Sequence, residues 1–390
     1  MIGYFVIILL AAGSVLAAAF FFRHRQKQVM DGLSDMLEAA INGTFSETTF
    51  DESRQSSLEN RLAQYLAASE LSVRSIDGER EKIKELIADI SHQTRTPLSN
   101  ILLYTELLEE EPLARHTSFR IGGPAAVFAQ PSSAEELAAL LRLLSEKNIR
   151  PRVLGAGTNV LAPDEGLREV VVCTKDALLG LTGLGGGEIE AGAGETLSKT
   201  AVFARNLGLT GLEFAHGIPG TVGGGIYMNA GAYGGEMKQA AVRTTALSMD
   251  GAMRVFSGDE QGFSYRTSAF ENLDMIIVKT VFRLLPGQTD AITARMQSLM
   301  EKRRASQPLE LPSAGSTFKR PEGAYAGALI EQAQLKGVRV GGACVSEKHA
   351  GFVVNTGGAT AQDVRALIAL IQKRVFETSG FHLQPEVRIW

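Results

Sequence analysis

Cysteine is scarce in this sequence, and neither sign of charge is in large excess. The 390 residues include only two cysteines, Cys173 and Cys344, which form no disulfide framework and have no metal-ligand spacing. We therefore expect a reducing compartment and no metal site. The formal net charge of −4 lacks the basic excess of a phosphate-binding surface, so nucleic acid is not expected as a partner. With 45% hydrophobic and 21% charged residues, the chain suits a globular protein of two or three domains.

The amino terminus carries the one long apolar run. Residues 2–22 are apolar or small throughout, and a helix of this length crosses a bilayer core of roughly 30 Å. Arg23, Arg25 and Lys27 follow directly, which places the carboxyl side in the cytoplasm. The sequence predicts a transmembrane anchor over residues 1–24 that tethers a cytoplasmic catalytic part to the inner face of the plasma membrane. A cleaved signal peptide is the alternative, although a basic n-region is missing.

A polar segment of helical character follows the apolar run, from residue 26 to residue 111. Its apolar side chains recur at three- and four-residue spacing, and such a stripe needs a partner helix. The stripe therefore predicts self-association through the amino-terminal part. Pro112 ends this helix in our interpretation, because the residue before a proline disfavours the helical conformation. His92 lies on this segment before Pro97, and a lone histidine on a helix is usually a surface or core residue.

The phrase around His92, Asp-Ile-Ser-His-Gln-Thr-Arg-Thr-Pro-Leu-Ser-Asn-Ile, resembles the phosphoacceptor box of membrane-bound sensor histidine kinases. The resemblance covers residues 1–111 and implies that His92 accepts a phosphoryl group from ATP. No second dimerisation helix follows, and no Asp-x-Gly-x-Gly box is present to hold ATP, so His92 would be phosphorylated in trans. The join to the remainder is either a genuine fusion or an error of sequence assembly.

Glycine is dense between residues 211 and 236, GLEFAHGIPGTVGGGIYMNAGAYGGE. Apolar side chains such as Leu212 and Phe214 interrupt the glycines, so this stretch is not a flexible linker. We expect a buried, tightly bent loop whose backbone approaches a flat or charged ligand, and a turn-rich structural loop is the alternative. A shorter glycine turn at 155–159 can form a nest of N–H groups for a pyrophosphate. It is not a Gly-x-Gly-x-x-Gly fingerprint and no crossover helix follows, so a Rossmann site is disfavoured.

The pattern around these turns is α+β. Helices are expected over residues 134–147, 197–207 and 361–378. Strands are expected at residue 152 and over residues 170–174, 188–191, 244–249, 255–257 and 275–284, with a closing strand that contains residues 385–388.

Six phrases occur in a characteristic order after residue 112. They are GAGTN at 155–159, GIPGTVGG at 217–224, MNAGAYG at 228–234, YRTS at 265–268, PSAGS at 312–316 and PEV at 385–387. In this order they resemble the UDP-N-acetylenolpyruvoylglucosamine reductases over residues 112–390. The resemblance implies an FAD-binding domain of the vanillyl-alcohol-oxidase (PCMH) type over residues 112–290 and a smaller α+β substrate-binding domain over residues 291–390, behind the helical segment 25–111.

The resemblance also implies a reaction. NADPH passes a hydride to FAD, and the reduced flavin passes it to C3 of the enolpyruvyl group of UDP-N-acetylenolpyruvoylglucosamine. Arg266 corresponds to the arginine that holds and polarises the substrate carboxylate, Ser316 to the proton donor to C2, and Glu386 to the carboxyl that helps to stabilise the enol form. Without the resemblance, they would be interpreted as a surface ion pair, a turn residue and an edge-strand charge.

The remaining site residues follow from the same resemblance. FAD binding is expected at Gly155, Ala156, Gly157, Thr158, Asn159, Gly217, Ile218, Pro219, Gly220, Val222, Gly223, Gly224, Asn229 and Gly231. Substrate binding is expected at Tyr265, and at Lys319, Arg303 and Arg304 for the diphosphate, with solvated surface charge as the alternative. His216 and His349 are expected to hold loops rather than to transfer protons.

Overall fold

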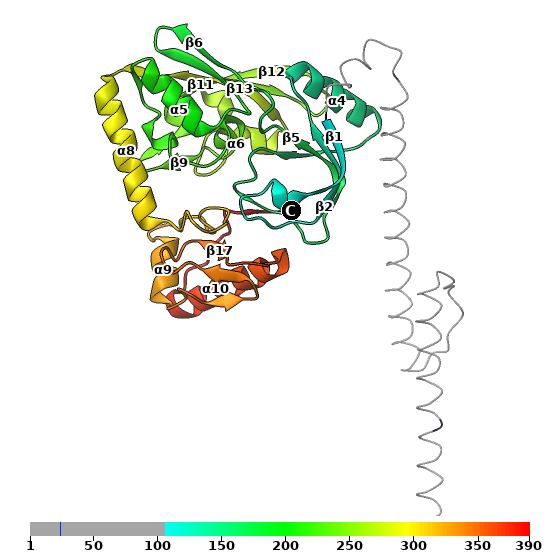
Figure 1. Cartoon of the computed structure of the whole chain (residues 1–390), viewed down its shortest axis with the longest axis vertical. Helices are drawn as coiled ribbons and strands as arrows, with labels where there is room; N and C mark the ends of the chain where they lie inside the picture. The colour runs from blue at the N-terminus through cyan, green and yellow to red at the C-terminus, as the bar shows by residue number, and fades with distance from the viewer. Residues whose placement is uncertain (1–23, 25–105) are drawn as a thin grey trace, which may run out of the picture. The chain divides into compact units, whose positions relative to one another are not determined.

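The computed structural model describes His24 and residues 106–390, and the latter lie in a single compact unit of the chain (Figure 1). The predicted anchor at residues 1–24, except His24, lies outside the described residues, as do the helical segment up to residue 105 and His92. Among the described residues, no helix is both long enough and apolar enough to cross a bilayer.

The first sheet has four strands in the order β1-β2-β5-β3, of which β2, β5 and β3 are parallel and β1 is antiparallel to β2. The bounds are Glu106–Pro112 for β1, Pro124–Gln130 for β2, Arg152–Leu154 for β3 and Leu167–Cys173 for β5. Helix α4, Ala134–Glu146, connects β2 to β3 and confirms the helix expected at 134–147. Ser133 caps its amino end, and Leu137, Leu140, Leu141 and Leu144 are buried on one face.

Strand β1 corrects the interpretation of residues 106–111, which were expected to continue the helix. These residues pair with β2 along their length, with Leu108 opposite Phe128 and Pro112 opposite Pro124. Glutamate and leucine favour helix locally, but pairing with a buried strand overrides that weak preference. An edge strand also tolerates its glutamates. The predicted boundary at Pro112 therefore falls at the end of a strand of the sheet.

The second sheet has five antiparallel strands in the order β12-β11-β13-β7-β6. The bounds are Leu181–Gly185 for β6, Glu188–Gly192 for β7, Ala241–Leu247 for β11, Met253–Ser257 for β12 and Ile276–Arg283 for β13. The central strand β13 buries side chains on both faces, because other elements cover both sides of the sheet. Helices α5, Leu197–Asn206, and α6, Val222–Tyr227, lie between β7 and β11 in the chain.

Helix α6 corrects the expectation of a bent loop for the whole glycine-rich stretch. Three of its six residues are glycine, which normally disfavours helix. Here the helix packs too closely for side chains: a Cβ on Gly223 would lie 3.0 Å from the Cβ of Ala193, and one on Gly225 would lie 3.0 Å from Leu197 Cδ2. Thr221 caps its amino end by accepting from the Gly224 N–H. The glycines of this stretch therefore allow a helix to pack closely against its neighbours, in addition to forming turns.

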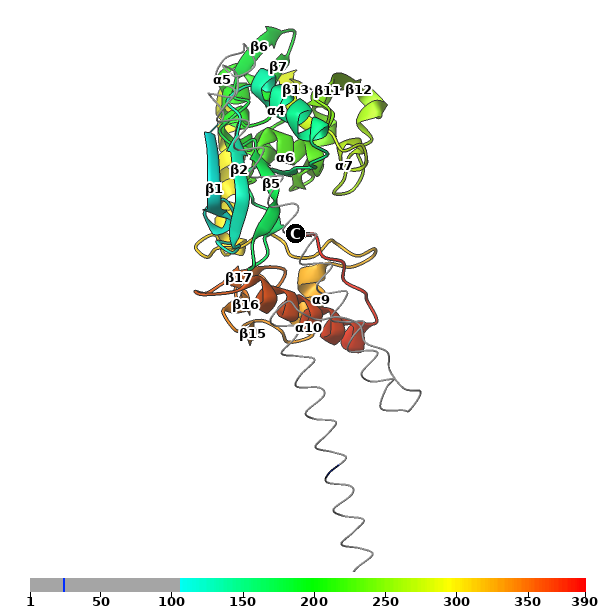
Figure 2. The same ribbon diagram turned by 90° about the vertical axis from the view of Figure 1, so that its right-hand side faces the viewer.

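Short pairings close the sheet part. Strand β8, Leu209–Thr210, pairs with β14, Leu285–Pro286; β9, Gly231–Ala232, pairs with β10, Gly235–Glu236; and β4, Val160–Leu161, pairs in parallel with β18, Arg388–Ile389. Helix α7 spans Ala269–Asn272. The β4–β18 pair brings the end of the chain beside the glycine turn at 155–159, and the carboxyl terminus lies between the sheet part and the carboxyl-terminal part in both views (Figures 1 and 2).

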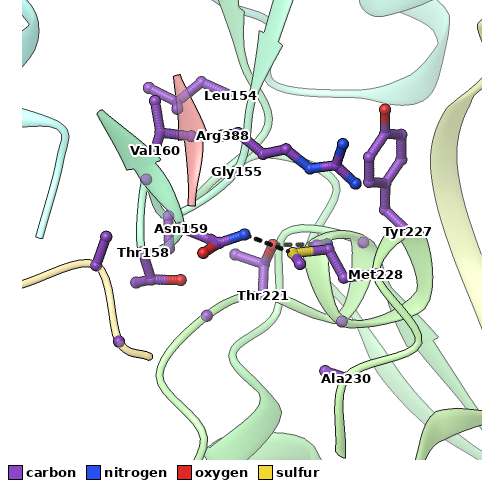
Figure 3. Close-up of a pocket in the computed structure, with 18 of the residues that line it drawn as sticks. Leu154, Gly155, Thr158, Asn159, Val160, Thr221, Tyr227, Met228, Ala230 and Arg388 are labelled. Atoms are coloured by element: carbon purple, nitrogen blue, oxygen red, sulfur yellow. Dashed lines mark hydrogen bonds between the residues drawn. The ribbon is translucent and has the colours of Figure 1, made fainter. Parts of the chain in front are cut away.

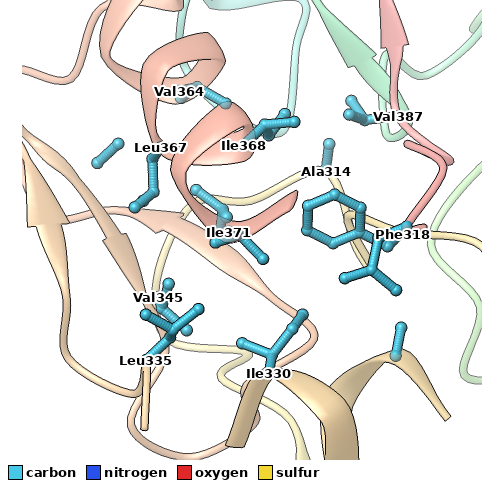
Figure 4. Packing of buried hydrophobic residues seen from close by; sticks show 14 of the residues in the cluster. Ala314, Phe318, Ile330, Leu335, Val345, Val364, Leu367, Ile368, Ile371 and Val387 are labelled. Atoms are coloured by element: carbon cyan, nitrogen blue, oxygen red, sulfur yellow. The ribbon is translucent and has the colours of Figure 1, made fainter. Parts of the chain in front are cut away.

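Helix α8, Thr289–Ser306, runs along one side of the unit to the carboxyl-terminal part (Figure 1). That part contains helices α9, Ala326–Gln332, and α10, Ala361–Ser379, and a sheet of β15, Arg339–Val340, β16, Ala343–Val345, and β17, Val353–Asn355. In the hydrophobic core of this part, α10 packs against the sheet and against Phe318 and Val387 (Figure 4). Phe318 and Val387 lie close in sequence to Ser316 and Glu386, which were predicted to be catalytic. The observed architecture is the expected α+β fold with two parts.

Candidate active site

A cavity of about 1100 Å³ lies between the glycine turns of the sheet part and the carboxyl-terminal part. Figure 3 shows the wall formed by the turn at 155–159, helix α6 and strand β18. Arg266, Ser316 and Glu386 all line this cavity. Three residues from distant parts of the sequence thus meet at one site.

Arg266 occupies a two-residue turn whose ends, Ser264 and Thr267, pair with each other. The backbone of Arg266 is left-handed, with a φ of +57°, a conformation that residues other than glycine seldom adopt. Its Nη2 donates to the carbonyl oxygen of Gly231 at 3.2 Å, and its Nε lies 3.1 Å from Glu386 Oε1. The Nε–H makes no aligned hydrogen bond with any described residue, so the contact with Glu386 is an ion pair rather than a directed hydrogen bond.

The carboxyl group of Glu386 is largely shielded from solvent. Burial raises the pKa of Glu386 above its usual value, and the charges of Arg266, Lys319 and Arg388 offset only part of that rise. The protonated carboxyl therefore persists to higher pH than on an exposed glutamate. Its main chain is held by Asn159, whose Nδ2 donates to the Glu386 carbonyl oxygen at 3.0 Å.

Ser316 is brought beside Glu386 by main-chain pairing of two segments. The Glu386 N–H donates to the Thr317 carbonyl oxygen, and the Lys319 N–H donates to that of Gln384, each at 2.8 Å. The hydroxyl of Ser316 donates to the carbonyl oxygen of Phe318 at 3.2 Å, only two residues away. The bond is local, so the hydroxyl can rotate toward a ligand without breaking a long-range contact.

His349 supports the same segment, as expected for a residue that holds a loop. Its Nδ1 accepts from the Gly351 N–H at 3.1 Å, and the Gly351 carbonyl oxygen accepts from the Thr317 N–H at 2.9 Å. Burial lowers the pKa of His349, so the ring is neutral near pH 7 and carries its proton on Nε2. This chain of contacts fixes the backbone beside Ser316.

Arg388 and Glu271 form a second ion pair, which was not predicted from the sequence. Arg388 Nη1 contacts Glu271 Oε1, while the Thr267 hydroxyl donates to Glu271 Oε2 at 2.8 Å. Burial alone would raise the pKa of Glu271, but the contacts with Arg388 and Thr267 together hold it below its usual value. Residues 386 and 388 project from one side of an extended segment, so this spacing was the available signal.

The glycine turn at 155–159 has the form of the predicted nest. Gly157 has a φ of +61°, and a Cβ there would lie 2.0 Å from the His116 carbonyl oxygen. Within the described part of the chain, the backbone N–H groups of residues 156–159 donate to no protein acceptor. Such a row of open donors beside a cavity fits the pyrophosphate of FAD.

Thr158 and Asn159 were expected to add side-chain donors to this nest, but both side chains bond within the protein. The Thr158 hydroxyl donates to the Pro219 carbonyl oxygen, and Asn159 Nδ2 lies 2.9 Å from Met228 Sδ in addition to its bond with Glu386 (Figure 3). The cradle is therefore built from main chain.

Of the residues expected to contact FAD, all but three line the cavity. Gly155, Ala156, Gly157, Thr158, Asn159, Ile218, Pro219, Gly220, Gly223, Gly224 and Gly231 line the cavity. Gly217, Val222 and Asn229 are not part of its lining. Val222 is fully buried in the core, and Gly217 lies against the Arg303 side chain. The N–H groups of Val222 and Gly223 donate to Glu195 and Ala193 carbonyl oxygens, so the amino end of α6 is already occupied.

Of the residues expected to bind the substrate, some line the cavity and others do not. Lys319 and Arg303 line the cavity, whereas Arg304 is exposed and does not. Tyr265 is also outside the lining: its ring lies beside the Arg266 guanidinium, 5.5 Å away, and its hydroxyl accepts from the Arg320 N–H. Tyr227, Met228, Gln307 and Trp390 line the cavity without having been expected there.

Three family models match the chain. The FAD binding domain matches residues 125–257, and the C-terminal domain of UDP-N-acetylenolpyruvoylglucosamine reductase matches residues 307–390. The His Kinase A (phospho-acceptor) domain matches residues 82–120, and the end of that match, from residue 106, includes strand β1 of the first sheet. The kinase-like match and the sheet therefore overlap in sequence.

Similar sequences and a similar solved structure agree with these matches. The chain is 48% identical over 292 residues to the UDP-N-acetylenolpyruvoylglucosamine reductase of Caldanaerobacter subterraneus subsp. tengcongensis, covering 75% of this chain and 96% of the relative. It is 44% identical over 295 residues to that of Lachnoclostridium phytofermentans, covering 75% and 95%. The crystal structure of the reductase (MurB) from Thermus caldophilus matches with a TM-score of 0.61 and 35% identity, covering 73% of this chain and 98% of that one. The chain therefore belongs to the UDP-N-acetylenolpyruvoylglucosamine reductase family and has an FAD-binding domain followed by the carboxyl-terminal domain of that family.

Proposed function

We propose that this chain reduces the enolpyruvyl group of UDP-N-acetylenolpyruvoylglucosamine to give UDP-N-acetylmuramate, with NADPH as the source of hydride. The observation that carries the proposal is the meeting of Arg266, Ser316 and Glu386 at a cavity beside the nest. Family membership already makes the chain an FAD-dependent reductase of cell-wall synthesis. The proposal adds the reductant and the role of each residue.

The main chain at 155–159 holds the FAD pyrophosphate in this proposal, because these residues line the cavity and the N–H groups of residues 156–159 donate to no acceptor among the described residues. Gly220 supports the same turn: its φ is +139°, and a Cβ there would lie 3.2 Å from the Thr158 hydroxyl. Bound FAD supplies the hydride for the enolpyruvyl group. The protein then has to orient the substrate, stabilise negative charge on it and deliver one proton.

Arg266 stabilises the negative charge. Hydride arrival at C3 leaves electron density on C2 and on the adjacent carboxylate of the substrate. A guanidinium presents a planar fork of donors that suits a carboxylate, and Arg266 has an Nε donor with no aligned partner among the described residues. Because the turn that carries it is anchored in advance, little reorganisation is needed in the transition state.

Ser316 donates the proton to C2, and Glu386 stabilises the enol form of the substrate. A hydroxyl is a weak acid, but a carbanion-like C2 is a strong base, so a positioned serine is sufficient. The raised pKa of Glu386 keeps a protonated fraction available to donate a hydrogen bond to the developing charge. Hydride at C3 and a proton at C2 together complete the reduction of the double bond.

Arg303 and Lys319 bind the diphosphate of the substrate in this proposal. Arg303 is 8% exposed and forms no ion pair with another described residue, and burial lowers its pKa. A desolvated cation gains from an anionic ligand, and its place on the cavity wall allows one to reach it. Lys319 lines the same cavity and adds a second positive charge.

Turnover by the full-length protein loaded with FAD tests this function. We expect NADPH to remove the visible absorbance of the bound FAD and the enolpyruvyl substrate to restore it. Mass spectrometry should then detect a product heavier than the substrate by two hydrogen atoms. FAD that is reduced by NADPH but never reoxidised by the enolpyruvyl compound would contradict the proposed substrate.

A second function, phosphoryl acceptance at His92, is supported by the phosphoacceptor-domain match over residues 82–120. We expect an intact histidine kinase to label the full-length chain with phosphate from ATP in trans, and His92→Gln to abolish that label. His24→Gln is the matched control and should be labelled like the unchanged chain. Label that persists in His92→Gln would rule out this acceptor.

A further inference from the structure

We propose that Asn229 is a positioning residue that fastens the glycine-rich loop to the turn carrying Arg266, and thereby sets the guanidinium against Glu386. The family resemblance had implied that Asn229 contacts FAD. The proposal rests on the role given above to Arg266, and it assigns Asn229 no contact with FAD or substrate.

The side chain of Asn229 is buried and fully engaged. It is 1% exposed, and its Nδ2 group donates to the Ser264 carbonyl oxygen at 2.9 Å and to Glu236 Oε2 at 3.1 Å. Its Oδ1 accepts from the Lys238 N–H at 3.0 Å. Ser264 is the first residue of the turn that contains Arg266. One amide group therefore joins helix α6, the β9–β10 hairpin and the catalytic turn.

Two further bonds join the same segments on either side of Asn229. The Ser268 hydroxyl donates to the Tyr227 carbonyl oxygen at 2.8 Å, and Arg266 donates to that of Gly231 at 3.2 Å. Residues 227, 229 and 231 thus contact residues 268, 264 and 266 of the turn. All three bonds are partly buried, but the Asn229 side chain, which is 1% exposed, also bonds to Glu236 and Lys238, and residue 229 lies between residues 227 and 231. The Asn229 bond is therefore the central fastening of a left-handed turn that would otherwise relax.

No other side chain meets the requirements of this position. Asn229 has a φ of +44°, a conformation that asparagine and glycine adopt more readily than other residues. The site also needs two N–H donors and one acceptor within one short side chain. Glycine satisfies only the backbone, and aspartate would place an acceptor against the Ser264 carbonyl oxygen and the Glu236 carboxylate.

Loss of the Asn229 hydrogen bonds should change the pKa of Glu386. The charged groups that act on Glu386 are Arg266, Lys319 and Arg388, and each lowers its pKa. The positions of Lys319 and Arg388 do not depend on Asn229, because these residues belong to other segments of the chain. If Arg266 moves away, Glu386 loses the first of these cations, and the pH at which Glu386 deprotonates should rise.

Asn229→Gly tests the proposal, because glycine keeps the left-handed backbone and removes only the amide. We expect kcat to fall by about 10- to 100-fold, as for a misplaced catalytic group, with a larger fall in Asn229→Asp. We also expect the alkaline limb of the kcat profile to move to higher pH, while FAD affinity and reduction of FAD by NADPH remain within about twofold of the unchanged protein. The matched control is Asn148→Gly, an exposed asparagine with a φ of 55° at the end of α4, which should change none of these quantities.

Ser268→Ala removes a neighbouring bond without altering backbone freedom, and it should shift the pH limb in the same direction by a smaller amount even if Asn229→Gly folds poorly. Loss of FAD affinity as the main defect would restore Asn229 to the cofactor site and overturn the proposal. An unchanged kcat, or a reduced kcat with an unshifted pH limb, would overturn it as well. If the unchanged protein itself does not turn over the enolpyruvyl substrate, the proposed function fails instead.

Discussion

Replacing Ser316 with alanine is expected to lower the rate of product formation by about 10²- to 10⁴-fold, the range that a positioned proton donor contributes. FAD binding and reduction of FAD by NADPH should not change, because the hydroxyl takes part only after the hydride has left the cofactor. The fold should also persist: the lost bond is the local one to the Phe318 carbonyl oxygen, and the neighbouring Thr317 keeps its main-chain bonds to Gly351 and Glu386. Rapid-mixing absorbance of the two half-reactions separates these effects.

Ser313 offers a control within the same Pro-Ser-Ala-Gly-Ser phrase. Its carbonyl oxygen accepts from the Ser118 hydroxyl, but it does not line the cavity, so Ser313→Ala should retain both half-reactions. Ser316→Cys keeps an ionisable proton at the position and should regain part of the lost rate. If Ser316→Ala reoxidised with substrate as fast as the unchanged protein, another group would have to supply the proton to C2.

The elements best predicted from the sequence are those whose side-chain period is strong and whose ends are marked. Helix α4 was predicted at 134–147 and α10 at 361–378, and the structure has Ala134–Glu146 and Ala361–Ser379. Both have a capping residue at the amino end, Ser133 and Thr360, and a continuous apolar face. Strands β11 and β13 were found for a similar reason, since their apolar runs are bounded by turns.

The elements that were missed depend on tertiary contacts that no local pattern records. Strand β1 and helix α6 contradict their local propensities, as described above. Helix α8 was not expected, although Ile292, Met296 and Leu299 are buried at helical spacing. Its apolar stripe ends at Arg303, a buried cation, and on a stripe of this kind a charge normally indicates the solvent face.

The residues proposed to be catalytic were predicted by resemblance and could not have been predicted by spacing. Arg266 and Glu386 are 120 positions apart, and their contact depends on the left-handed turn and on the pairing of residues 384–386 with residues 317–319. The Glu271–Arg388 pair and the engaged amide of Asn229 depend on the same folding. A glycine-rich motif specifies which backbone can bend, but the sequence does not say which side chains will face the ligand and which will hold the loop.

Replacing Arg266 with glutamine should have two separable consequences. The loss of the guanidinium removes the donors that stabilise charge on the substrate carboxylate, and kcat should fall by about 10²- to 10³-fold. The loss of the positive charge also removes the first of the cations that lower the pKa of Glu386. That pKa is already raised by burial, so it should rise further, and a limb of the pH profile that requires protonated Glu386 should move to higher pH. The kcat profile of the FAD-loaded full-length protein measures both effects.

Arg266→Lys distinguishes the two consequences. Lysine keeps the positive charge but lacks the planar fork of donors, including the Nη2 group that donates to the Gly231 carbonyl oxygen. We expect a loss of kcat in this variant with little movement of the pH limb, since a cation still faces Glu386. Arg254→Gln, at a surface position of β12 with 58% side-chain exposure, should leave both quantities unchanged. Equal pH limbs in Arg266→Gln and the unchanged protein would mean that the guanidinium does not act on Glu386, and the ion pair at 3.1 Å would then have no part in tuning the carboxyl group.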